Sequence, residues 1–565
     1  MSKLVMKNNI NSELSIIHSD DKPAKSIVGT DIAVAVDTIN DFPLGASDGD
    51  TVIVRDLDRG GTFIYDSSKV ANDNQGTNFN GWIRQYNGAV NIKWFGAKSI
   101  TIQEYSTYDS TQAIQKAIDS FSSYGTIKIP SGKFLVTDTL NITNKSITFM
   151  GDGISSSTIM FNPANNRVLL NFIREKGEQK INAIKNITLK TAIQSCGTAV
   201  KIETSLTSSN EQVNGAIDTL LLNNVLITQE DNGYWTKFIH TVNNGGVHLL
   251  NVQMKNSIPD AQNDVNTIGI HVERTDSRVH IIRTLSITDF YIQRVYNAFK
   301  FHSNDYHGIE SFYVSTGEIV GANTGILVDK HLEAVHLDGV HFDIISNVID
   351  WSNGVINLAR FDGCDFRKGD NGSSLVYSPM FLVGRGEDIS FTGCIFSGFN
   401  DSYSDSRNIA FKFLTSSAGS RVTRFDVAGC TFRNLYGVYG DLGASGVRAQ
   451  SNLYAAIEDS VSVEVVADTH LSLFDANVSK TFTVHLNGSV DEQIDVPVSP
   501  FFKSAYASAV LIPASQGLSS GTIVYYHFDG STNTNCRFIV HGNSNSGTFR
   551  FSFMAFGDST YDTRL

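Results

Sequence analysis

Four six-residue copies of one pattern lie between residues 337 and 432: LDGVHF at 337–342, FDGCDF at 361–366, FTGCIF at 391–396 and VAGCTF at 427–432. Each copy has an apolar residue, a polar or small one, Gly, then Val or Cys, a variable residue and Phe. The spacings between successive glycines are 24, 30 and 36 residues. A fixed core pattern with spacers of variable length is typical of stacked coils, in which each repeat buries its apolar face only against its neighbours.

Weaker copies precede this stretch at 186–189, 224–227, 251–254 and 289–292, each with Asn or Asp before an apolar residue. Such residues tolerate the bend between two short strands. We therefore predict an all-β chain whose centre is a right-handed parallel β-helix. Cys364, Cys394 and Cys430 would then form an inward ladder. A single file of thiols has no tetrahedral geometry, so we expect buried hydrophobes and neither a metal nor another cofactor.

Composition limits the possible classes of protein. A chain of 565 residues exceeds one ordinary core, which favours two or three unequal domains around a solenoid. The formal charge of −13 argues against a nucleic-acid partner. The first ten residues lack a signal-peptide core, and no apolar stretch approaches the roughly 18 residues of a membrane span, so we expect a soluble chain made in the cytoplasm. Five cysteines without CxxC spacing make a disulfide framework improbable.

The N-terminal part predicts a small β-rich domain over residues 1–92, with strands near 50–54, 62–66 and 80–84. A short amphipathic helix follows, with Asp109 or Ser110 at its start and Ala113, Ile114, Ala117, Ile118 and Phe121 on one face. It is suited to covering the exposed apolar end of a β-helix. The β-helix domain is expected to span residues 93–443.

The coil pattern stops near residue 443. Strand-like segments at 461–466, 481–486, 522–528, 537–540 and 548–553 alternate with Asn, Ser and Gly turns. This spacing favours a C-terminal β-sandwich over residues 444–565.

Several landmarks in residues 50–132 resemble the N-terminal half of bacteriophage tailspikes of the pectate-lyase-like superfamily. The landmarks are Gly61-Thr62-Phe63, Gly81-Trp82-Ile83-Arg84, Trp94-Phe95-Gly96-Ala97-Lys98, the helix at 109–118 and Ile129-Pro130-Ser131-Gly132. One departure is the segment Ser99-Ile100-Thr101-Ile102-Gln103, where relatives usually have Gly-Asp-Gly and an acidic turn.

The resemblance implies a homotrimeric virion fibre, a tail fibre or spike, that is made in the host cytoplasm and acts at the host cell surface. Its substrate would be a bacterial capsular polysaccharide or O-antigen, which such proteins bind and usually cleave. The N-terminal domain would attach the fibre to the phage tail or to another virion protein. The C-terminal domain would trimerise the chain or bind carbohydrate, and the resemblance does not separate these two roles.

The repeat also predicts which side chains face outward. With Gly as position zero, positions −4, −2, +1 and +3 are apolar and point inward, so −3, −1 and +2 point outward. The coil before Gly339 aligns through Phe312, Val314 and Ile319. The outward positions on three consecutive coils are then Tyr313, Glu318, His336, Asp338, His341, Arg360, Asp362 and Asp365. Ionisable groups become fewer on the later coils.

Glu318, Asp338, Asp362 and Asp365 are the candidate catalytic residues of a glycoside hydrolase. Neighbouring coils lie about 4.8 Å apart, so Asp338 and Asp362 would be close, and Glu318 and Asp365 about 9–10 Å apart at the backbone. Retaining glycosidases need carboxyls about 5–5.5 Å apart and inverting ones about 6.5–9.5 Å. The competing interpretation is a charged, solvated face without catalysis.

A polysaccharide lyase on the same fold is the alternative enzyme, because it would abstract a proton with His, Lys, Arg or Tyr beside a uronic carboxylate. His336, His341, Arg360 and Tyr313 supply that set and are also candidate substrate-binding residues. Trp235, Tyr291, Tyr306 and Trp351 could stack on sugar rings, or could instead pack at a subunit interface or beneath a loop. A receptor-binding adhesin without catalysis is the third hypothesis.

Overall fold

The protein is described by a computed structural model. The described residues are 6–7, 32–101, 108–175, 179–205, 219–276, 278, 282–303, 308–369, 378–399, 407–414, 422, 424–440, 447–450, 453–457, 476–486, 491–497, 508–513, 525–531, 535–541 and 547–557. The chain forms two compact units, Met1–Glu211 with Ile217–Asn256, and Gln212–Ala216 with Ser257–Leu565.

Unit 1 begins with a six-stranded sheet in the order β1-β2-β3-β4-β6-β5. Its strands are β1 (Met6–Lys7), β2 (Ile32–Val36), β3 (Thr51–Val54), β4 (Gly61–Tyr65), β5 (Asn78–Phe79) and β6 (Trp82–Arg84). Two short 3-10 helices, η1 (Ile39–Asp41) and η2 (Ser67–Asn72), connect them. Val52, Phe63 and Trp82 belong to its buried core. The small β-rich domain expected here is therefore present.

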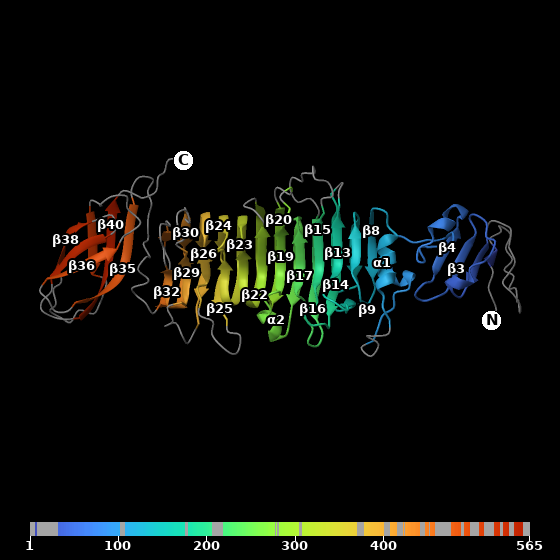
Figure 1. The fold of residues 1–565 in the computed structure, drawn as a ribbon, viewed down its shortest axis with the longest axis horizontal. Coiled ribbons are helices and arrows are strands. Elements are labelled where there is room, and N and C mark those ends of the chain that lie inside the picture. Colours follow the sequence, from blue (N-terminus) through green and yellow to red (C-terminus); the bar gives the residue numbers. More distant parts are fainter. Residues whose placement is uncertain are drawn as a thin grey trace. The chain divides into compact units, whose positions relative to one another are not determined.

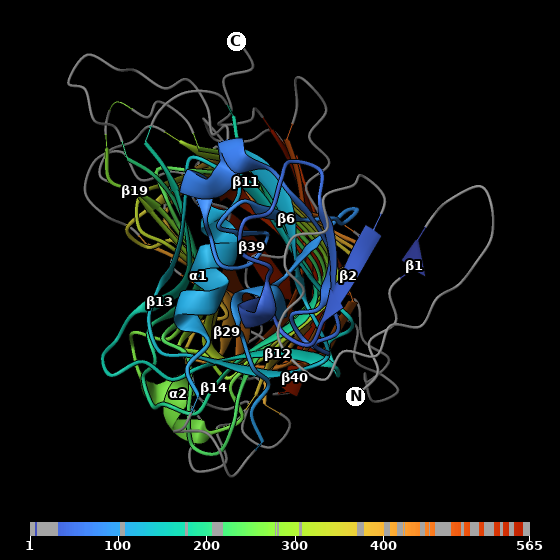
Figure 2. The same ribbon diagram turned by 90° about the vertical axis from the view of Figure 1, so that its right-hand side faces the viewer.

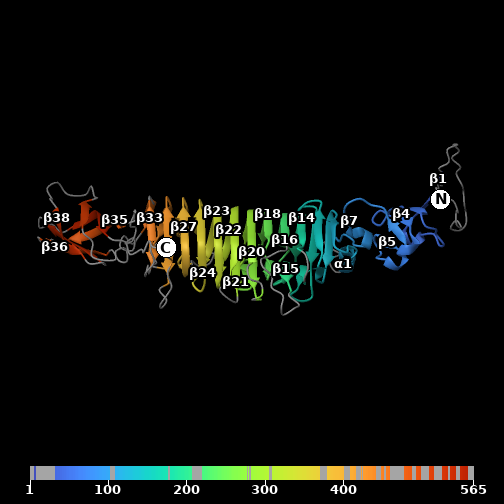
Figure 3. The same cartoon turned by 90° about the horizontal axis from the view of Figure 1, so that it is seen from above.

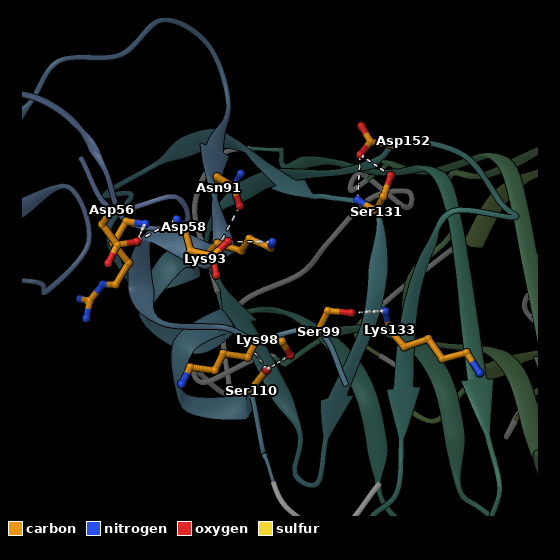
Figure 4. Close-up of polar contacts among 11 residues, drawn as sticks. Asp56, Asp58, Asn91, Lys93, Lys98, Ser99, Ser110, Ser131, Lys133 and Asp152 are labelled. Atoms are coloured by element: carbon orange, nitrogen blue, oxygen red, sulfur yellow. Dashed lines mark hydrogen bonds and ion pairs between the residues drawn. The ribbon is translucent and has the colours of Figure 1, made fainter. Parts of the chain in front are cut away.

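A short segment joins this sheet to the first coil (Figure 4). β7 (Val90–Asn91) already pairs in parallel with β8 (Tyr124–Ile129), so coil pairing begins before the expected boundary at residue 92. The Asn91 side chain accepts a hydrogen bond from the Lys93 backbone at 3.0 Å and starts η3 (Ile92–Phe95). Lys93 reaches back to Asp58 at 2.8 Å.

The helix α1 (Thr111–Asp119) lies at the start of the coils (Figure 2). Asp109 accepts a hydrogen bond from the Thr111 backbone, while Ser110 occupies the N-cap without a side-chain bond. The Gln115 side chain exchanges two hydrogen bonds with the backbone of Asn141 in β10 (Leu140–Thr143). The helix thus satisfies an otherwise unpaired strand edge, as a cap must. None of the helices among the described residues is long and apolar enough to cross a membrane.

The coils of unit 1 pass through three columns of parallel strands, in which successive strands lie side by side (Figures 1 and 3). The first column contains β8, β11 (Ser146–Gly151) and the first halves of β14 (Ile181–Thr191), β16 (Thr219–Gln229) and β18 (Val247–Lys255). The second contains β9 (Gly132–Val136), β12 (Ser157–Phe161) and the second halves of those three strands. The third contains β10, β13 (Val168–Arg174), β15 (Thr198–Thr204) and β17 (Lys237–Val242).

Unit 2 repeats this three-column design, after the short helix α2 (Pro259–Asn263). The first column contains parts of β20 (Ile282–Gln293), β22 (Ile309–Val328) and β23 (His331–Asp350), then β24 (Val355–Asp362), β27 (Arg385–Thr392), β30 (Phe425–Ala428) and β33 (Val447–Gln450). The second continues β20, β22 and β23 into β25 (Asp365–Lys368), β28 (Ile395–Ser397), β31 (Thr431–Leu435) and β34 (Leu453–Ile457). The third contains β19 (Ile268–Arg274), β21 (Asn297–Ser303), the ends of β22 and β23, β26 (Phe381–Val383), β29 (Ile409–Phe413) and β32 (Gly437–Gly440).

From β14 to β31, one left-handed residue separates the first column from the second in each coil. In unit 1 this residue is Asn186, Asn224 or Asn251, with φ of 55°, 55° and 53°. In unit 2 it is Asp289, Thr316, Gly339, Gly363, Gly393 or Gly429. The three asparagines also hydrogen-bond to one another through their side chains, at 2.8 and 3.1 Å. Asn, Asp and Gly tolerate this conformation, which explains the residue pattern from which the bend was predicted.

The interior is built from ladders of like residues. Phe342, Phe366, Phe396 and Phe432 follow one another in register and are fully buried. Phe396 and Phe432 stack with ring centroids 4.6 Å apart. Each such side chain stabilises the fold by roughly 1.5–3 kcal/mol through burial. Cys364, Cys394 and Cys430 are buried thiols outside any disulfide, in agreement with the predicted inward ladder.

The C-terminal end of the coils corrects one expected boundary. β33 and β34 pair in parallel with β30 and β31, so coil pairing extends to Ile457 and does not stop at 443. Main-chain groups make these pairs, so a segment such as Val447–Gln450 can continue a ladder without the Gly and Phe of the repeat.

Two three-stranded antiparallel sheets follow, the components expected of the β-sandwich. One is β35 (Ala476–Leu486), β40 (Gly547–Gly557) and β37 (Ser508–Pro513), and the other is β36 (Asp491–Pro497), β39 (Asn535–His541) and β38 (Tyr525–Ser531). The strand expected at 461–466 lies outside the described residues.

The bend predicts a specific response to substitution at Gly393. A Cβ there would meet nothing within 4 Å, so a new side chain changes only the backbone energy at φ of +62°. We expect Gly393→Ala to lower the free energy of unfolding by about 1 kcal/mol. Gly393→Asn should cost less, because Asn holds the equivalent position in three coils of unit 1. Thermal midpoints measured at one scan rate test this, and equal losses in both variants would contradict it.

Candidate active site

The predicted outward residues meet on one face of unit 2, in two adjoining columns. In the first column, Tyr313, His336 and Arg360 follow one another in register on consecutive coils. Beside them, Asp338 and Asp362 face each other across one coil step. Strand pairing places such neighbours about 4.8 Å apart at the backbone.

The second column continues this face beyond the left-handed bend. Tyr291, Glu318, His341 and Asp365 follow one another in register on four consecutive coils. The two acids Glu318 and Asp365 are separated by two coil steps, as predicted, and His341 holds the position between them on the intervening coil.

A histidine–carboxylate pair links neighbouring coils of the first column. Nε2 of His336 lies 3.2 Å from Oδ2 of Asp362, and both side chains are more than two-fifths exposed. The ring of Tyr313 meets the His336 ring edge to face, with centroids 6.5 Å apart. Tyr313 is 45% exposed, so part of its ring faces solvent.

A second, less exposed pair lies in the second column. Nδ1 of His341 is 3.2 Å from Oδ2 of Asp365, which also accepts hydrogen bonds from Nε and Nη2 of Arg367 at 2.9 and 2.7 Å. The bond to Asp365 raises the pKa of His341 above its ordinary value of 6.5. Burial tends to raise the pKa of Asp365, but the bonds from His341 and Arg367 outweigh it and hold that pKa below the ordinary 3.8. Asp365 is thus an anion at neutral pH.

Two of the predicted acids lack such partners. Glu318 and Asp338 are exposed, and neither makes a hydrogen bond or an ion pair with the described residues. Glu318 acts electrostatically on Tyr291, a half-buried residue on the preceding coil. Burial, followed by the charges of Glu318 and Asp343, raises the pKa of Tyr291, which keeps its phenol protonated.

Two aromatic predictions are wrong. Trp235 is 1% exposed, stacks on Phe161 and donates its Nε1 hydrogen to the carbonyl of Thr228 at 2.7 Å. Trp351 is fully buried. Neither indole offers a face to a sugar, because apolar rings of this size fill the interior of the coils. Tyr306, the other aromatic candidate in this region, lies outside the described residues.

The structure adds two charged residues that the sequence pattern did not single out. Asp343 and Arg367 follow His341 and Asp365 by two positions and pair in register, so they belong to the same outward face. Extending the alternation from position +2 to +4 of the repeat would have located them. The next coil carries Ser390, Thr392 and Ile395 at the outward positions, and the one after it carries Asp426, Ala428 and Thr431, so ionisable groups become fewer there.

Comparison with known proteins identifies relatives of the fold. The sequence matches no protein-family model and no curated protein. Among solved structures, the gp42 tailspike of an Acinetobacter phage matches with a TM-score of 0.53 and 14% identity over 94% of each chain. The tailspike of another Acinetobacter phage gives 0.43 and 12%, covering 93% of this chain and 99% of that one.

The enzymatically active domain of tailspike protein 2 from bacteriophage CBA120 gives a TM-score of 0.42 and 12% identity, covering 92% of this chain and 85% of that one. At such identities a match shows the fold, and the gp42 match carries this conclusion. The chain thus has the all-β, parallel β-helix architecture of a phage tailspike.

The His341–Asp365 pair predicts how stability changes with pH. The raised pKa of His341 means that its stabilising contribution is complete below pH 6.5 and is lost as the pH rises through the folded-state pKa. The lowered pKa of Asp365 makes its contribution complete above pH 3.8 and lost as the pH falls through its folded-state value. We expect His341→Gln to reduce the thermal midpoint most between pH 3.8 and pH 6.5, and progressively less in alkaline buffer.

His248 provides a control of opposite sign, because burial lowers its pKa in the folded state. The stability of His248→Gln relative to the parent protein should therefore rise as the pH falls below 6.5. A pH-independent effect of His341→Gln would show that the ion pair does not form in solution.

Proposed function

We propose that this chain is a phage tailspike that recognises and depolymerises a bacterial surface polysaccharide, a capsule or an O-antigen, by glycosidic hydrolysis. The fold shared with the gp42 tailspike supports the first part of this proposal. The observation that carries the second is the outward face of β20 to β25, where four candidate acids and two histidines gather on consecutive coils.

The four acids fall into two chemical groups. Asp362 and Asp365 each hold a histidine, whereas Glu318 and Asp338 are exposed and unpaired among the described residues. Hydrolysis of a glycoside needs one protonated acid at the leaving oxygen and one carboxylate as nucleophile or base. We assign direct contact with the sugar to Glu318 and Asp338, and we assign to Asp362 and Asp365 the positioning of His336 and His341.

His341 strengthens the hydrolytic assignment. Its raised pKa favours the imidazolium form, which can donate a proton or bind a sugar oxygen but cannot act as a base. Its place in register with Glu318 sets this donor beside an exposed carboxylate. Tyr313 and Tyr291 then provide the aromatic surface against which a pyranose ring could pack.

A polysaccharide lyase is the second candidate, and the first column favours it. Tyr313, His336 and Arg360 follow one another in register, which combines a potential base with a cation for a uronic carboxylate. The excess of carboxylates around them opposes binding of a uronate-rich polymer. Hydrolysis remains the better-supported reaction for this reason.

Single amide substitutions test the hydrolytic proposal. Glu318→Gln, Asp338→Asn, Asp362→Asn and Asp365→Asn preserve side-chain size and remove proton chemistry. At least two of them, Glu318→Gln and Asp338→Asn first, should lose about a hundredfold or more in turnover. Turnover is measured as new reducing ends on purified capsule or O-antigen, together with the ultraviolet absorbance of an unsaturated uronate.

Glu387→Gln is the matched control, because Glu387 is an exposed acid on the first column outside the cluster. Reducing ends without absorbance mean hydrolysis, and both signals together mean elimination. Binding without either signal would leave a receptor-binding adhesin. Full activity in all four amides would place catalysis elsewhere in the assembly.

We further propose a homotrimer that attaches to the phage tail or another virion protein through residues 1–92. The antiparallel sheets of residues 476–557 are the proposed trimerisation or carbohydrate-binding element. We expect light scattering to show a trimer at micromolar concentration, and deletion of residues 461–565 to yield monomers or aggregates. A monomeric full-length protein would contradict the proposed homotrimer. An intact trimer after the deletion would mean that residues before 461 hold the subunits together.

A further inference from the structure

A buried lysine lies close to the proposed glycan-binding face. Lys368 ends β25, the strand that begins with Asp365. It pairs in register with Ile344, two positions beyond the buried pair Phe342 and Phe366, so its side chain takes an inward position of the coil. Lys368 is 7% exposed. Lysines are almost never buried to this degree unless paired with an acid.

The hydrogen-bond partners of Lys368 are neutral. Nζ donates to the carbonyl oxygen of Ser346 and, at 2.8 Å, to Oγ of Ser378. Within the described part of the chain no carboxylate pairs with it. Burial lowers the pKa of Lys368 to about 7, so a large fraction of the amine is neutral under physiological conditions.

Ser378 is positioned by a small hydrogen-bond network. Its Oγ donates to the carbonyl oxygen of Ser346 at 3.0 Å and lies 3.3 Å from Oγ of Ser346. The Asn347 side chain donates to the carbonyl of Pro379 at 2.7 Å and fixes the segment next to the serine. Ser378 itself is half-buried, whereas Lys368 is enclosed, so the serine is the more accessible member of the pair.

We propose that Ser378 and Lys368 form a nucleophile–base pair that hydrolyses small acyl esters, such as acetyl esters, on sugar hydroxyls. A serine with a neutral amine at hydrogen-bond distance is a recognised arrangement for covalent acyl transfer. This activity goes beyond glycosidic cleavage and uses none of the residues assigned to it. Lys368 shares strand β25 with Asp365 of the proposed glycan-binding face, and Ser378 precedes β26.

The proposed reaction balances with water as the only co-reactant. Oγ of Ser378 attacks the ester carbonyl, and its proton passes to Nζ of Lys368. The carbon–oxygen bond to the sugar then breaks, the ammonium returns the proton to the sugar oxygen, and an acyl-serine remains. Water, deprotonated by the neutral amine, attacks the acyl carbon. The bond to Oγ breaks, and Ser378 recovers its proton while the carboxylic acid leaves.

Two assays on the full-length protein test this pair. A fluorophosphonate probe should label Ser378, as located by peptide mass spectrometry, and p-nitrophenyl acetate should be hydrolysed. Ser378→Ala should abolish labelling and reduce ester hydrolysis by about a hundredfold or more. Lys368→Arg retains a cation that does not deprotonate and should lose activity similarly.

Ser352→Ala is the control, because Ser352 is half-buried like Ser378 but follows β23 on the neighbouring coil, outside this network. Ester hydrolysis in Ser352→Ala should equal that of the parent protein. Thermal midpoints check that each variant folds, and reducing-end formation should persist in Ser378→Ala, which separates this activity from the depolymerase. The proposal would be overturned if the parent protein showed no more labelling and no more ester hydrolysis than Ser378→Ala.

Discussion

The left-handed bend between the first and second columns is the constraint on which the coils from β14 to β31 depend. A single residue with φ near +55° reverses the side-chain alternation between two strands without a loop. It therefore keeps the apolar positions on both sides pointing inward and the polar ones outward. In unit 2 the same bend holds Asp338 and His341 close in sequence yet in different columns, which creates one continuous face from two short strands.

Parallel stacking converts sequence repetition into chemical ladders. Identical positions of successive coils lie one strand spacing apart, so aromatic residues stack inside and ionisable residues interact outside. Phe361 and Phe391 stack with centroids 4.5 Å apart, and on the outside each histidine meets an acid of the next coil. The same geometry would make like charges repel, and the alternation of His341 between Glu318 and Asp365 reduces that repulsion.

The charged groups of the candidate site differ in how exposed they are and in whether they have partners. The more enclosed acid, Asp365, is neutralised by His341 and Arg367, while the most exposed acids remain unpaired among the described residues. An unpaired charge is costly only where water is excluded, so exposed positions such as Glu318 and Asp338 can hold carboxylates without partners. Lys368 differs, because among the described residues no carboxylate pairs with it, and burial lowers its pKa to about 7.

The sequence by itself determined the coil architecture and the outward register. The spacing of Gly, Phe and apolar residues sufficed because strand alternation is a local property of the backbone. It could not determine which outward side chains hydrogen-bond, since the pairing of His336 with Asp362 depends on the offset between separate coils. Nor could it show that Trp235 and Trp351 are buried, because their environment comes from distant segments. Local periodicity thus decided the direction of each side chain, and only the tertiary stacking of coils decided its partners.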